Sequence, residues 1–141
     1  MKPAVIFDLD GTLIDSVPDI HISANRAFAP LGASFSHAEV QGFVGRGAPH
    51  LLSRLAESRG FAGKGPEFDD LLARFLEIYE QTHDLTALYP GVLAALGALA
   101  AEGARLGLCT NKPLAPTRAV LRHFGLSCFA AIVGGDSLAV K

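Results

Sequence analysis

The sequence has few cysteines and no long apolar run, and both absences narrow the range of possible functions. Its two cysteines, Cys109 and Cys128, have neither the spacing of a metal site nor that of a redox motif. Both stand among apolar residues, so we expect two small buried side chains and no disulfide. The apolar runs end before the ~18 residues that a membrane-spanning helix needs, and the N-terminus lacks a signal-like layout. These features predict a soluble, cytoplasmic protein without a membrane partner.

Charge is also sparse. Charged residues make up 18% of the 141 residues, and the formal net charge is −2. Half of the residues are hydrophobic, which predicts an ordered core rather than disorder. Because no strong positive excess is present, nucleic acid is not an expected partner. At this length the chain fits one ordinary domain better than two large ones.

Two aspartates at the end of the first predicted strand carry the strongest chemical signal. Residues 4–7 form an apolar run with β-branched side chains, which predicts a strand buried on both faces of a parallel sheet. Asp8 and Asp10 follow, and residues i and i+2 of an extended chain point to the same side. Two carboxylates in one small volume repel each other unless a cation neutralises them or one keeps its proton. An ordinary Asp-Gly turn is the alternative, but the whole run indicates a chemical site.

The segment from residue 16 to residue 85 predicts four helices and no convincing strand. Ser16 and Asp19 have the spacing of a capping box, which begins a helix, and Ser36 and Glu39 repeat it. Apolar residues then recur at helical spacing in the segments that follow. We therefore expect a small helical domain here.

Strands are expected again after this segment. Residues 105–109 and 129–133 are apolar runs, each preceded by a helical pattern that ends at glycine. This alternation implies parallel strands joined by right-handed crossovers. The predicted fold is α/β, with a core made of residues 1–15 and 86–141 and a helical cap, residues 16–85, inserted after the first strand.

The run from Asp8 to Thr12, Asp-Leu-Asp-Gly-Thr, resembles the nucleophile motif of the haloacid dehalogenase (HAD) superfamily. The resemblance implies a HAD-like Rossmannoid sheet, with Asp8 as the nucleophile that attacks phosphorus and Asp10 as the general acid and base. It further implies that Asp8 and Asp10 contribute to an Mg²⁺ site and that Gly11 and Thr12 contact the substrate. Since dehalogenases and phosphonatases of the superfamily lack an Asp at the position of Asp10, the motif favours a phosphate ester.

Two later segments resemble further motifs of the superfamily. The run Thr110, Asn111, Lys112 resembles the second motif, which implies that the Thr110 hydroxyl holds the transferring phosphoryl group and that Asn111 supports it. Lys141 follows the third predicted strand, as the lysine of the third motif does, and would balance the charge of the phosphate. A local cap at Thr110 and a surface lysine at position 141 are the alternative interpretations.

The fourth motif, a set of carboxylates after a further strand that completes the Mg²⁺ shell, is absent. A Gly-Asp-Ser sequence like that of the fourth motif occurs at residues 135–137. It follows the third predicted strand rather than a fourth, so we predict a loop there. The resemblance thus covers the whole chain but only about the first two thirds of the family's length, which implies that the C-terminal part of the core is missing. An inactive truncated fragment is therefore one alternative. Without the next strand, the Asp8 strand is expected to have an unpaired edge.

The cap and the remaining motifs indicate a substrate. A small cap that closes over the site predicts a small phosphorylated metabolite. A basic loop at Arg46 would bind a second anionic group of that substrate, with a solvated turn as the alternative. Residues 89–92 and 134–137 resemble phosphoglycolate phosphatases, so hydrolysis of 2-phosphoglycolate is expected, by a monomer or homodimer. A sugar-phosphate mutase of the same superfamily is the alternative enzyme.

Overall fold

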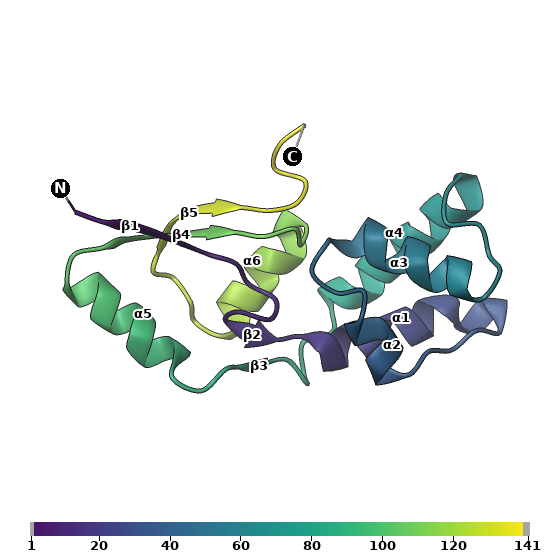
Figure 1. The fold of residues 1–141 in the computed structure, drawn as a ribbon, viewed down its shortest axis with the longest axis horizontal. Helices are drawn as coiled ribbons and strands as arrows, with labels where there is room; N and C mark the ends of the chain where they lie inside the picture. The colour runs from purple at the N-terminus through teal and green to yellow at the C-terminus, as the bar shows by residue number, and fades with distance from the viewer. Residues whose placement is uncertain (1, 140–141) are drawn as a thin grey trace. The chain divides into compact units, whose positions relative to one another are not determined.

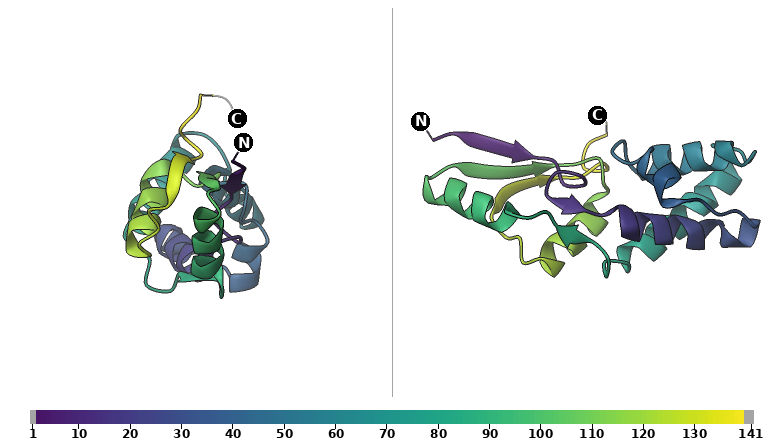
Figure 2. Two further views of the ribbon diagram at one scale, coloured as in Figure 1. Left: turned by 90° about the vertical axis from the view of Figure 1, so that its left-hand side faces the viewer. Right: turned by 60° about the horizontal axis from the view of Figure 1, so that its bottom comes forward.

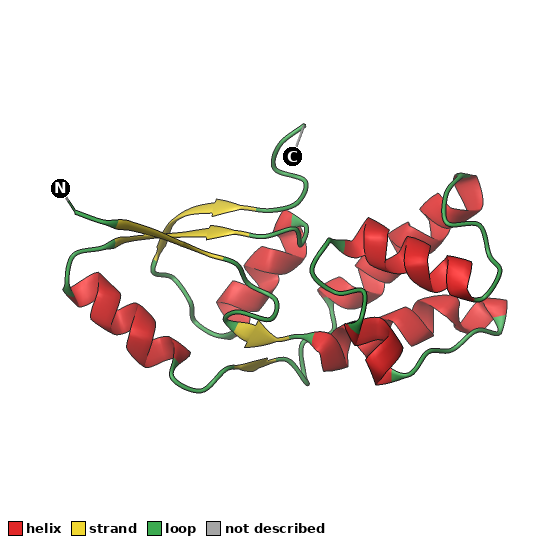
Figure 3. Cartoon of the chain, viewed as in Figure 1, coloured by secondary structure: helices red, strands yellow, loops and turns green. Residues whose placement is uncertain are grey.

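The computed structural model describes residues 2–139 and divides the chain into two compact units. The core unit consists of Met1–Asp15 and Ala87–Lys141, and the helical unit consists of Ser16–Thr86. Strands and helices alternate in the core unit, whereas the helical unit contains helices and loops (Figures 1 and 3). None of the helices in the described part of the chain combines the length and the apolar character that crossing a bilayer requires.

In the core unit, β2 (Ile14–Asp15) and β3 (Ala87–Leu88) pair as a short antiparallel sheet. Three parallel strands form the main sheet of this unit. They are β1 (Ala4–Phe7), β4 (Arg105–Cys109) and β5 (Phe129–Val133), in the spatial order β1-β4-β5. Phe7 pairs with Leu108, and Leu108 pairs with Ile132. The predicted α/β fold with parallel strands is confirmed.

Both helices of the core unit cover the same face of this sheet. They are α5 (Val92–Ala101), which precedes β4, and α6 (Leu114–His123), which precedes β5. The chain steps across the sheet twice in the same direction, and right-handed crossovers then place both helices on one side. Figures 1 and 2 show α5 and α6 below the strands in agreement with this rule.

The covered face of the sheet carries the apolar core of the unit. Leu106 and Leu108 point to this side and are 3% and 1% exposed. Buried residues of the helices and of the turn after β1 complete the cluster: Leu9, Leu13, Ile14, Val92, Leu96, Val120, Leu121 and Leu126. The helices are thereby held against β1, β4 and β5.

The opposite face of the sheet is bare among the described residues, which corrects the expectation that the first strand is buried on both faces. Ile6 is 72% exposed. β1 lies at the edge of the sheet and pairs with β4 alone in the described part of the chain. The alternation of side chains therefore buries one set of β1 residues partly and leaves the other set in contact with water.

The prediction that both cysteines are buried is wrong. Cys109 and Cys128 are free and exposed. Cys109 shares the bare side of β4 with Gly107, because successive strand residues alternate between the faces. Cys128 lies in the connection between α6 and β5.

The helical unit contains the four expected helices and a short 3₁₀ turn, η1 (Ala29–Leu31). The helices are α1 (Val17–Phe28), α2 (His37–Gln41), α3 (Ala48–Ser58) and α4 (Pro66–Glu80). Their apolar faces meet in one core, which contains Ile20, Ala24, Ala27, Phe28, Phe35, Val40, Leu51, Leu52, Leu55, Ala56, Phe68, Leu71, Phe75 and Tyr79. This unit therefore has a hydrophobic core of its own.

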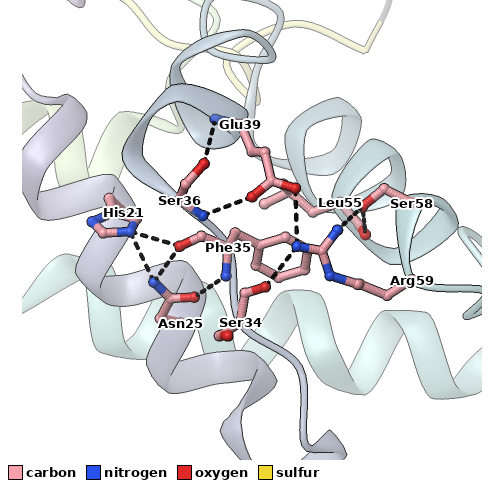
Figure 4. A network of polar contacts seen from close by, with 9 residues as sticks. All are labelled: His21, Asn25, Ser34, Phe35, Ser36, Glu39, Leu55, Ser58 and Arg59. Carbon is pink, nitrogen blue, oxygen red and sulfur yellow. Dashed lines mark hydrogen bonds and ion pairs between the residues drawn. The ribbon is translucent and has the colours of Figure 1, made fainter.

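A polar network fixes the loop before α2 (Figure 4). The Asn25 side chain accepts the N–H of Phe35 at 2.8 Å and donates to the Phe35 carbonyl at 3.0 Å. The capping box of Ser36 and Glu39 is present as predicted. Arg59 donates to Glu39 at 2.9 Å and lies over the Phe35 ring. Together with the Ser36 N–H, Arg59 lowers the pKa of Glu39 to about 2.

The capping box predicted for Ser16 and Asp19 is wrong. Ser16 occupies the N-cap position of α1 but makes no side-chain capping bond. Asp19 is fully buried, and its carboxylate accepts the backbone N–H groups of Leu85 and Thr86 and the Thr86 hydroxyl. The segment at Leu85 and Thr86 supplies three hydrogen-bond donors to the Asp19 carboxylate, so the side chain points to this segment and not to the start of α1. Asp19 thus ties the two ends of the helical unit together.

The first prediction concerns this tie. Asp19→Asn keeps the size of the side chain but leaves one acceptor oxygen for three donors, so buried N–H or O–H groups lose their partners. We expect the free energy of unfolding to fall by about 1–3 kcal/mol, as for an unsatisfied buried group. Chemical denaturation of the full chain measures this. Asp84→Asn, an exposed neighbour of Leu85, is the control, and equal stability of the two variants would contradict the role of Asp19.

The second prediction concerns Glu39, whose pKa of about 2 lies below the usual 4.5. A lowered folded-state pKa stabilises the fold fully above the unfolded value, and this contribution disappears as the pH falls through the folded value. Between about pH 4.5 and 2 the melting temperature of Glu39→Gln should therefore vary less with pH than that of the parent chain. Glu57→Gln, in an exposed pair with Arg54, is the control. Parallel pH profiles for Glu39→Gln and the parent would refute the prediction.

Candidate active site

The turn after β1 sets Asp8 and Asp10 on either side of a buried anchor, Leu9. The Leu9 carbonyl accepts the N–H groups of residues 12–14 at 2.9 to 3.2 Å. Gly11 has a φ of 79°, in the left-handed region that favours glycine. Asp8 is exposed and Asp10 is half-buried. The turn thus presents both carboxylates at the carboxyl end of β1.

Thr110 lies at the corresponding end of the neighbouring strand. Its backbone N–H donates to the Val133 carbonyl at 3.0 Å, which joins the end of β4 to that of β5. Its Oγ1 accepts the N–H of Lys112 at 3.1 Å. The local cap that was the alternative interpretation is therefore present. A hydroxyl that accepts one hydrogen bond still has a proton to donate, so the cap is compatible with a contact to a phosphoryl oxygen.

Lys112 is the residue whose role the sequence analysis missed. Its ammonium group Nζ lies 3.1 Å from Oδ1 of Asp10, and the two side chains are 3% and 12% exposed. The sequence analysis placed Lys112 in the second motif but gave its side chain no function. A usable signal was present, because the carboxyl ends of neighbouring parallel strands meet at one edge of a sheet and bring a lysine after β4 close to acids after β1.

Asp136 has a structural role in the turn that follows β5. Its Oδ1 accepts the N–H of Leu114, the first residue of α6, at 2.7 Å. Gly134 donates its N–H to the Ser137 hydroxyl at 2.8 Å. The prediction of a loop rather than a metal-binding motif at Asp136 agrees with this arrangement.

The other predicted site residues are distributed as follows. Gly11 and Thr12 are exposed in the turn after β1, and Asn111 is exposed just beyond β4. Arg46 belongs to the helical unit, where it lies exposed in the connection between α2 and α3. Lys141 lies outside the described residues. The structure therefore brings the Asp8 turn and the Thr110 segment together within the core unit.

The acidic pair fits a magnesium ion in its donor chemistry. Within residues 2–139 no group of three or more His, Cys, Asp or Glu side chains is placed to hold a metal. Mg²⁺, however, is usually bound through one or two carboxylates, with substrate phosphate oxygens and water as further ligands. The Asp8 carboxylate and the backbone carbonyl of Asp10 are oxygen donors of this kind at the carboxyl end of β1.

Comparison with known proteins identifies relatives along nearly the whole chain. Residues 2–141 match the haloacid dehalogenase-like hydrolase family. The phosphoglycolate phosphatase of Cereibacter sphaeroides is 50% identical over 139 residues, which are 96% of this chain and 64% of that protein. The phosphoglycolate phosphatase of Rhodobacter capsulatus is 44% identical and matches all of this chain and 65% of its own length. The chain therefore spans less than two thirds of these relatives.

Solved structures of similar fold point to the same family. A predicted phosphoglycolate phosphatase from Haemophilus somnus has a TM-score of 0.88 and 32% identity, covering 98% of this chain and 64% of its own. CbbY from Rhodobacter sphaeroides, solved in complex with phosphate, has a TM-score of 0.83 and 25% identity, covering 100% of this chain and 67% of its own. The resemblance stated from the Asp8–Thr12 run is thus confirmed, and the chain belongs to the haloacid dehalogenase-like hydrolase family.

Proposed function

We propose that the complete protein is an Mg²⁺-dependent phosphatase that hydrolyses a small phosphomonoester, with 2-phosphoglycolate as the best candidate. The observation that carries this proposal is the position of Asp8 and Asp10 at the carboxyl end of β1, beside Thr110 at the end of β4. Open α/β sheets bind ligands at these strand ends. The relatives named phosphoglycolate phosphatase, which are 44–50% identical over this chain, support the substrate.

In the first step a carboxylate oxygen of Asp8 attacks phosphorus, and the bond between phosphorus and the alcohol oxygen breaks. Asp10 gives its proton to the departing alkoxide. Splitting the reaction through a covalent aspartyl-phosphate replaces one slow step by two faster ones. This matters because phosphate monoesters are among the compounds that water hydrolyses most slowly.

In the second step Asp10, now ionised, takes a proton from a water molecule that attacks the phosphorus of the aspartyl-phosphate. The bond between Asp8 and phosphorus breaks, inorganic phosphate leaves, and Asp8 returns to its carboxylate form. Asp10 is then protonated and ready for the next cycle. The same residue thus serves as acid and as base, as general acid–base catalysis requires for two opposite proton transfers.

The remaining residues bind and orient the phosphoryl group. Bound Mg²⁺ would neutralise the charge shared by the phosphate and the Asp8 carboxylate, with the Asp8 carboxylate and the backbone carbonyl of Asp10 as its protein ligands. The Thr110 hydroxyl and Asn111 would donate hydrogen bonds to phosphoryl oxygens, together with N–H groups of the turn at Gly11 and Thr12. Lys141 would add positive charge.

The helical unit is proposed to act as a cap that admits small substrates. Arg46 would pair with the carboxylate of 2-phosphoglycolate, because a guanidinium group matches a carboxylate with two parallel hydrogen bonds. A small metabolite as substrate is in keeping with the cytoplasmic location expected from the sequence.

The third prediction tests the nucleophile. Asp8→Asn in the complete protein removes the attacking carboxylate, so turnover of 2-phosphoglycolate should fall by at least ~10³-fold. Rapid quench of the parent with phosphorus-labelled substrate should trap an acid-stable, hydroxylamine-labile adduct at Asp8. Asp69→Asn, an exposed acid of α4, is the control for folding and handling.

Two results would count against this mechanism. One is an active enzyme without an adduct at Asp8. The other is a product mixture in which the phosphoryl group returns to the substrate and no free phosphate appears, which would indicate a mutase.

The fourth prediction tests Arg46. Arg46→Ala should raise KM for 2-phosphoglycolate by the equivalent of about 1.5–3 kcal/mol, the usual contribution of a charge-assisted hydrogen bond. KM for p-nitrophenyl phosphate, which has no carboxylate, should change little. Arg54→Ala, also exposed in the helical unit, should leave both values unchanged. Equal increases for the two substrates would show that Arg46 only shapes its loop.

A further inference from the structure

The ion pair between Lys112 and Asp10 is unusual in this chain because it is buried. The other ion pairs found among residues 2–139 join side chains that are 33% to 51% exposed, whereas Lys112 is 3% and Asp10 12% exposed. A buried ammonium needs a close, well-placed negative charge to compensate for lost hydration. Each member of the pair therefore depends on the position of the other.

Hydrogen bonds on both sides fix the backbone of Lys112. Its N–H donates to Oγ1 of Thr110 at 3.1 Å. Its carbonyl accepts the N–H of Gly135 at 2.8 Å and the hydroxyl of the fully buried Thr117 at 3.4 Å. The point from which the long lysine side chain starts is thus held in place, which lowers the number of positions its ammonium group can reach.

The turn after β5 braces this segment. A Cβ atom at Gly135 would lie 2.1 Å from the carbonyl oxygen of Asn111, so the turn can pack this closely against the Lys112 segment only with glycine at that position. The Asp136 carboxylate accepts the N–H of Leu114 and so satisfies one of the free donors at the start of α6. Through Gly135 and Asp136, which we call the brace, the turn after β5 is thus connected to the segment that carries Lys112.

We propose that Lys112 positions Asp10 for proton transfer, and that Gly135 and Asp136 hold Lys112 in the place where it does so. The inference rests on the proposed function, since it assigns a partner to the proposed acid and base. The contact with Oδ1 selects one orientation of the Asp10 carboxylate at the end of β1. A fixed orientation matters because proton transfer needs the acid within hydrogen-bond reach of the reacting oxygen. Lys112 is therefore a positioning residue.

The choice of substrate separates positioning of the acid from a general effect on folding or binding. Glycolate leaves as an alkoxide, a strong base that needs a proton in the transition state. Nitrophenolate is a weak base and leaves without one. A variant that misplaces the acid should therefore lose activity toward 2-phosphoglycolate much more than toward p-nitrophenyl phosphate. Loss of a structural contact would reduce both activities together.

The experiment compares Lys112→Met, Lys112→Arg and Asp10→Asn in the complete protein with both substrates. For Lys112→Met we expect kcat for 2-phosphoglycolate to fall by ~100-fold or more, the lower range of a general acid contribution, with a much smaller fall for p-nitrophenyl phosphate. Asp10→Asn should show the same split. Lys112→Arg, which keeps the charge but differs in shape, should recover part of the loss, and it replaces Lys112→Met if that variant does not fold.

The outcomes separate this inference from the proposed function. Equal losses for the two substrates, or no loss in Lys112→Met, would overturn the role of Lys112 while the phosphatase activity of the parent stands. A parent inactive on both substrates would overturn the proposed function instead. Crystal structures of the parent and of the folded variant would then decide the inference: an Asp10 carboxylate that turns away in the variant supports it, and an unchanged carboxylate refutes it.

Discussion

The parallel pairing of β1 with β4 is the constraint on which the candidate site depends. The register joins Phe7 to Leu108, so the residues that follow each strand emerge at the same edge. Asp10 and Lys112 are 102 positions apart in the chain but lie within a hydrogen bond of each other because of this pairing. A shift of one residue would turn every side chain of β1 to the other face of the sheet and separate the two groups.

The direction of the crossovers determines the rest of the core unit. Because α5 and α6 both lie on one face, Leu106 and Leu108 are buried while Ile6 on the other face is open to water. The same step from β4 to β5 places the turn at Gly135 against the segment after β4. The fold thus uses the carboxyl ends of three strands together: one for the acids, one for the lysine and one for the brace.

Local patterns in the sequence were sufficient to predict the three strands of the parallel sheet, the helices and the position of the acidic pair after the first strand, since each depends on neighbouring residues. The short strands β2 and β3, which pair with each other across the helical unit's segment, were not predicted. Contacts between distant segments were not predictable in this way. Lys112 contacts Asp10 only because the register of β1 and β4 brings the two residues together. The Asp19 side chain binds Leu85 and Thr86, which lie 66 and 67 positions later in the chain. The exposure of Cys109 depends on which face the helices cover. The apolar neighbours of Cys109 in the sequence therefore led to a wrong prediction of its burial.

The most direct test of the account is whether Asp8 accepts a phosphoryl group. Beryllium fluoride with Mg²⁺ forms a stable mimic of a phosphorylated aspartate, and bound fluorine has its own signals in ¹⁹F NMR. The account predicts such signals for the complete protein and their loss in Asp8→Asn. Bound signals of equal strength in both proteins, or none in the parent, would contradict Asp8 as the nucleophile.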